Sequence, residues 1–155
     1  MAKSRHVPGP DAARVEVAIK SMGALRARVG WFESSKYPDG TPAAYVAMIQ
    51  ENGYGPIPPR PFFAPTVEAS KGDWQRIAEG ASRQMLKGAL TAEGALEMLG
   101  LQAEGDVRKT ISQITEPQLG KRTLKARKRR SNASEKPLVD TRYMINTLTS
   151  VVDSK

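Results

Sequence analysis

The residue types that most often carry enzyme chemistry are sparse in this chain. His6 is the only histidine, and cysteine is absent. A catalytic triad needs a base beside its nucleophile, and no second histidine can serve one elsewhere. Without cysteine there is no thiolate nucleophile, disulfide or thiolate zinc ligand. His6 lies in an N-terminal stretch expected to fray, so an incidental histidine is favoured over a catalytic one.

Acidic residues offer only weak alternatives. Glu33 with Asp39, or Asp73 with Glu79, are the kind of pairs that can bind a metal or exchange protons. Nothing in the sequence brings either pair together, and a solvated surface is the favoured interpretation. Neither a phosphate-binding loop nor a dinucleotide-binding glycine fingerprint occurs. The sequence therefore predicts no enzyme, no cofactor and no metal site.

Positive charge is concentrated in one segment. The formal net charge is +8, and residues 121–130 contain seven basic residues and no acidic one. Such a run predicts contact either with DNA phosphates or with acidic patches of a partner protein. We expect 116–136 to be a long, mobile basic loop in the free protein, because it has too little apolar surface to offset the cost of ordering. The candidate contact residues are Lys121, Arg122, Lys125, Arg127, Lys128, Arg129 and Arg130.

Residues 50–65 form the most distinctive stretch, with five prolines and two glycines. Proline fixes φ and removes a backbone donor, so regular structure is excluded there. The apolar residues of this stretch still favour order, and we interpret it as a rigid, Pro-rich elbow that orients the next helix. An exposed aromatic residue on such an elbow is a candidate subunit contact. The candidate interface residues are Tyr54, Arg60, Phe62 and Phe63.

Hydrophobic periodicity predicts the elements around the elbow. Two long amphipathic helices are expected over 66–87 and 91–114, with Thr66 as an N-cap and Val67 on the buried face of the first. Residues 12–22 fit a helix or a strand equally well. A half-buried strand over 25–32, a short helix over 43–51, a helical turn near Tyr143 and a strand over 147–152 complete the prediction.

The length of 155 residues suits one domain. Within it we expect a flexible N-terminal tail over 1–10 and a C-terminal turn and strand over 137–155. No apolar run approaches the roughly 18 residues that span a membrane, so no membrane contact is predicted.

Several short motifs occur in a recognisable order. They are Val29-Gly30-Trp31-Phe32, Tyr37-Pro38-Asp39-Gly40-Thr41, Val46-Ala47 leading to Glu51-Asn52-Gly53, Ile57-Pro58-Pro59-Arg60-Pro61-Phe62-Phe63, and Lys136-Pro137-Leu138-Val139-Asp140-Thr141. The series resembles the neck and tail-completion proteins of tailed double-stranded DNA bacteriophages. Two residues depart from that pattern: Asn52 replaces an aromatic residue, and Arg142 replaces a glycine. The turn at Arg142 must therefore use a negative φ or tolerate strain.

The resemblance implies an α/β (α+β) subunit with a mainly antiparallel sheet and two longer helices packed on one face. It also implies a virion structural protein that assembles as a homo-oligomeric ring, commonly hexameric, between the head connector and the tail tube. Its partners would be other neck, connector and tail proteins, with possible contact to packaged DNA, and it would reside in the host cytoplasm during assembly. The alternative is a small basic nucleic-acid-binding protein that acts through 121–130.

Overall fold

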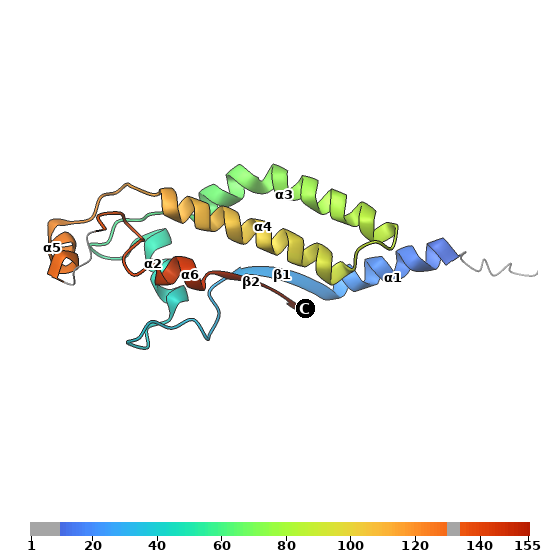
Figure 1. Cartoon of the computed structure of the whole chain (residues 1–155), viewed down its shortest axis with the longest axis horizontal. Helices are drawn as coiled ribbons and strands as arrows, with labels where there is room; N and C mark the ends of the chain where they lie inside the picture. The colour runs from blue at the N-terminus through green and yellow to red at the C-terminus, as the bar shows by residue number, and fades with distance from the viewer. Residues whose placement is uncertain (1–9, 130–133) are drawn as a thin grey trace, which may run out of the picture.

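A computed structural model describes residues 10–129 and 134–155, and these residues form six helices and one two-stranded antiparallel sheet (Figure 1). The α+β class is thereby confirmed. Met1 to Gly9 of the expected tail, and Arg130 of the basic run, lie outside the described residues. The elements are α1 Pro10–Ala24, β1 Leu25–Gly30, α2 Ala43–Asn52, α3 Phe63–Leu86, α4 Ala92–Gln113, α5 Lys121–Arg129, α6 Tyr143–Thr147 and β2 Thr149–Ser154.

The elements lie in layers along an elongated molecule. Helix α4 contacts both strands, and α3 packs against α4. Figure 1 shows α3 on the side of α4 away from the sheet, with α1 at one end of the molecule and α2, α5 and α6 gathered at the other. The end that holds α2, α5 and α6 brings together segments that are far apart in sequence.

The sheet has two strands, and helix α4 packs against both of them. Two strands alone are marginally stable in water, so cover from a helix is needed. Gly100 permits a close approach, because a Cβ there would lie 3.1 Å from Cβ of Ser150. Glu104 accepts the backbone N–H of Ser150 at 2.6 Å, and Arg108 donates to the Leu148 carbonyl at 2.7 Å. Helix α4 thus holds β2 by shape and by hydrogen bonds.

The main core lies where the elbow packs against the C-terminal part of α4. Phe62 is fully buried, together with Val107, Ile111 and Leu148. Trp31 packs edge-on against Phe62 and Phe63, with ring centroids 5.9 and 5.8 Å away. Its indole N–H donates to the Met144 carbonyl at 2.7 Å. The elbow is therefore part of the core.

The structure decides one open alternative and corrects two expectations. Residues 12–22 lie in helix α1. Helix α3 begins at Phe63, so Thr66 lies inside its first turn, buried, with its hydroxyl bonded to the Phe62 carbonyl at 2.6 Å. It is not the N-cap. Val67 was placed on the wrong face, since 46% of it is exposed.

The long basic loop expected over 116–136 was also wrong in part. Residues 121–129 form helix α5, and its Arg127 is buried. The segment is rich in lysine, arginine, leucine and alanine, which are all good helix formers, and the prediction of a loop considered only its charge and its few apolar residues. Arg127 also donates hydrogen bonds to the chain that returns from α5, and these contacts stabilise the helix in addition to its local propensity.

Candidate functional site

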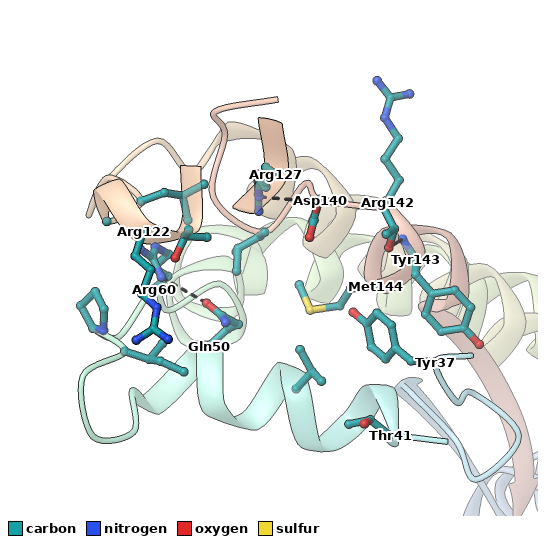
Figure 2. A pocket seen from close by; sticks show the side chains of 18 of the residues that line it. Tyr37, Thr41, Gln50, Arg60, Arg122, Arg127, Asp140, Arg142, Tyr143 and Met144 are labelled. Atoms are coloured by element: carbon teal, nitrogen blue, oxygen red, sulfur yellow. Dashed lines mark hydrogen bonds and ion pairs between the residues drawn. The ribbon is translucent and has the colours of Figure 1, made fainter. Parts of the chain in front are cut away.

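A cavity of about 900 Å³ lies at the end of the molecule where α2, α5 and α6 meet (Figure 2). Its walls come from the 37–41 turn, α2 with the elbow, the start of α5, and the segment that leads into α6. Figure 2 shows Tyr37, Tyr143 and Met144 at one end, with Arg60, Arg122 and Gln50 at the other. One end is thus aromatic and apolar, and the other is basic.

Arg60 is the most buried cation of this cavity. Only 4% of it is exposed. Its Nε donates to the Pro117 carbonyl at 2.8 Å, and its terminal nitrogens donate to Gln118 O at 3.2 Å and Gln50 Oε1 at 3.3 Å. Burial lowers the pKa of Arg60 below its ordinary value, and the nearby positive charge of Arg127 lowers this pKa further. The side chain ties the elbow to the segment before α5.

Arg127 holds the segment that follows α5. Its Nη1 donates to the carbonyls of Ser134 at 2.9 Å and Lys136 at 2.8 Å. Its Nε lies 3.5 Å from Oδ1 of Asp140, an ion pair drawn in Figure 2. Because this guanidinium is 5% exposed, these contacts fix how the chain returns from α5 to the core.

The basic residues of 121–129 fall into two groups, one buried and one exposed. Arg127 is internal, whereas the other described members are exposed. Of these, Arg122 also lines the cavity. The exposed members are Lys121, Arg122, Lys125, Lys128 and Arg129.

The four interface candidates are placed very differently. Tyr54 is 69% exposed, whereas Phe62 is fully buried. Phe63 is partly buried against the core. Arg60 was expected at a subunit boundary, but within the protomer its side chain points inward and is used there. Of the four, only Tyr54 is largely exposed.

Two side-chain contacts were not predicted from the sequence. Glu51, at the end of α2, accepts backbone N–H groups at the start of α3, although no local capping signature links them. Tyr37 and Tyr143 stack with ring centroids 4.6 Å apart, and the Tyr143 hydroxyl donates to the Lys36 carbonyl. Burial, and to a lesser degree the adjacent Tyr143, raises the pKa of Tyr37. The Glu51 contact joins two motifs that the sequence had singled out separately, and the Tyr37–Tyr143 contact joins one motif to the predicted helical turn.

Arg142 tolerates strain, one of the two outcomes expected for this turn. Its φ is 58° and its ψ is 5°, in the left-handed region. The Thr141 hydroxyl accepts the next N–H, that of Tyr143, at 3.3 Å. The turn that glycine would favour is therefore built with an arginine whose side chain is exposed.

Within 10–129 and 134–155, no group of three or more His, Cys, Asp or Glu side chains could hold a metal ion. No helix in the same residues is long and apolar enough to cross a membrane. Comparison with known proteins finds no matching family model, no similar curated protein and no similar solved structure.

Proposed function

We propose that the chain is a structural subunit of a phage neck or tail, which assembles as a ring that completes the tail and joins it to the head connector. One observation carries this proposal. Three of the segments that resemble the neck and tail-completion proteins, 37–41, 57–63 and 136–141, each contribute residues to the lining of the same cavity. Their convergence supports a shared role at one end of the subunit.

Exposed apolar side chains support an assembling subunit. The five most exposed of those on the described helices lie on α1, α2 and α4. Tyr45 and Met48 are three residues apart and so share one face of α2, and contiguous exposed apolar surface marks interaction sites. A ring repeats one surface around an axis, so each subunit needs two complementary patches. The side chains are Val17 at 63% and Ile19 at 65% on α1, Tyr45 at 49% and Met48 at 54% on α2, and Leu101 at 63% on α4.

The elbow suits such an assembly because it is held at both ends. The backbone N–H of Arg60 donates to the backbone carbonyl of Gln50 at 2.6 Å, and Tyr54 pairs with Ile57 through two backbone hydrogen bonds of 3.0 Å. A surface that is ordered before docking loses less entropy when it binds. Tyr54 on this elbow is the side chain we expect at a subunit contact.

Assembly is the direct test. The purified protein, alone and with connector and tail components, should form rings visible by electron microscopy and measurable by light scattering. Tyr54→Ser and Met48→Ser should weaken ring formation, whereas Gln75→Ser on the exposed face of α3 should not. A protein that stays monomeric under all these conditions, and is absent from phage particles by mass spectrometry, would refute the proposal.

A second candidate is nucleic-acid binding through α5. The favouring observation is that five basic side chains of this nine-residue helix are exposed. Binding through phosphate contacts weakens steeply with salt, by counterion release. Replacing Lys121, Lys125 and Lys128 with glutamine should abolish DNA binding in this case and leave ring formation unchanged. Salt-independent or absent binding would remove this candidate.

A further inference from the structure

Arg60 is a buried cation with no carboxylate partner among the described residues. Its three hydrogen bonds all go to neutral oxygens, those of Pro117, Gln118 and Gln50. A guanidinium has five N–H donors, so two remain for another acceptor. A charge kept out of water without a counterion is costly. The end of the cavity that Arg60 lines is therefore suited to an anion.

The other charges of the cavity reinforce this preference. Its lining includes four arginines, 60, 122, 127 and 142, and two aspartates, 39 and 140, which leaves two positive charges in excess. Asp140 is already ion-paired with Arg127. Asp39 accepts the backbone N–H of Thr41 at 2.9 Å. The ion pair described for these acids is that of Asp140 with Arg127, and Arg122 is exposed.

We propose that this cavity binds an acidic peptide segment of a partner protein. A carboxylate of the segment pairs with Arg60 and Arg122, since the planar guanidinium matches carboxylate geometry. A neighbouring apolar side chain of the segment lies against Tyr37, Tyr143 and Met144. The proposal concerns a binding partner and does not depend on ring assembly.

The lining favours a peptide over a nucleic acid. Val46, Ile57, Leu138 and Met144 give the cavity apolar walls that amino-acid side chains can fill. A phosphodiester backbone would leave these walls without contacts. Lys121, Lys125 and Lys128 of α5 do not line the cavity, so phosphate binding has a separate surface available.

The test is a peptide library read by fluorescence anisotropy. Each fluorescent heptapeptide carries two fixed carboxylates, one aromatic or leucine residue, and varied other positions. The tightest binders are then measured against wild type, Arg122→Gln and Lys128→Gln. Both positions are exposed on α5, but only Arg122 lines the cavity, so Lys128→Gln is the matched control for net charge. Neither variant removes a buried contact.

We expect Kd values below about 1 mM for the best peptides. Arg122→Gln should weaken them about tenfold, which is the effect of losing one charge-assisted hydrogen bond, and Lys128→Gln less than twofold. Bound peptide should also raise the Tm, and the same peptides with glutamine and asparagine in place of the acids should not bind. The proposal fails if no peptide binds, if both variants weaken binding equally, or if an oligonucleotide competes with the peptide and depends on Arg122 in the same way.

Discussion

The carboxylate of Glu51 accepts the backbone N–H of Phe62 at 2.7 Å, so the last turn of α2 caps the first turn of α3. The same carboxylate accepts from Phe63 at 3.0 Å and Ala64 at 3.1 Å. A negative charge at a helix N-terminus also interacts favourably with the helix dipole. The elbow between the two helices is therefore closed by a side chain at its start that bonds the backbone at its end.

Glu51→Ala should destabilise the protein by about 2 kcal/mol, because three backbone donors lose their acceptor. Chemical denaturation measures this change. Glu68→Ala is the control, since Glu68 is an exposed acid in the first turns of the same helix and pairs with Lys71. Its cost should stay below about 0.5 kcal/mol. Equal losses for both variants would mean that Glu51 contributes only general charge.

Phe62→Ala should cost about 3–5 kcal/mol, as for other large core side chains. The ring is fully buried and packs against Trp31. A thermal or denaturant titration is sufficient to measure it. Tyr54→Ala should leave stability unchanged, since its ring is largely exposed. A Phe62→Ala loss of less than 1 kcal/mol, on the order of a surface change, would contradict the core assignment.

Arg60→Ala should also destabilise the fold, by about 2–4 kcal/mol, because a buried side chain and its hydrogen bonds to Pro117, Gln118 and Gln50 are lost. A side chain that served only a subunit contact would instead leave folding intact. Arg60→Met should cost less than Arg60→Ala, since it fills the space without burying a charge. Comparison of the two variants separates lost packing from lost hydrogen bonds. If both variants were as stable as wild type, the bridge from the elbow to Pro117 would be unimportant.

The limits of sequence reasoning are visible in particular residues. Strand β1 alternates apolar and polar residues, and α4 repeats its apolar residues every three or four positions, so both follow from local pattern. Arg60 and Arg127 carry the same charge as the exposed lysines, and nothing local marks them as internal. Their acceptors are backbone carbonyls that lie near them only after folding. The cavity could not be predicted, because its walls come from segments about 100 residues apart.

Arg127→Ala should loosen the chain around α5 without unfolding the core. The side chain donates to the carbonyls of Ser134 and Lys136, and pairs with Asp140. Hydrogen exchange should become faster in α5 and in 134–140, while α3 and α4 keep their protection. Lys128→Ala, at an exposed position of the same helix, should leave exchange unchanged. Uniformly faster exchange in all helices would contradict a local anchor.

Asp153 should make the sheet sensitive to acid. A hydrogen bond from Arg26 at 2.9 Å, aided by Arg28, lowers the pKa of Asp153. A carboxylate whose pKa is lowered by folding stabilises the fold above its unfolded pKa, and loses this effect as the pH falls through the folded value. The stability difference between wild type and Asp153→Asn should thus be largest near neutral pH and shrink below about pH 4. A difference that does not change with pH would show that the charge of Asp153 is not involved.

Arg142→Gly should stabilise the protein, although it removes a long side chain. A non-glycine residue in the left-handed region costs about 1–2 kcal/mol. Glycine avoids this strain, but it loses more conformational entropy on folding, which offsets about 0.5–1 kcal/mol of the gain. The arginine side chain is exposed, so the net gain should be about 0.5–1 kcal/mol. The urea midpoint should rise with an unchanged m-value. Arg142→Ala is the control, since alanine loses the same side chain and keeps the positive φ of 58°. If alanine and glycine raise the midpoint equally, the gain comes from removing charge and not from relieving the backbone.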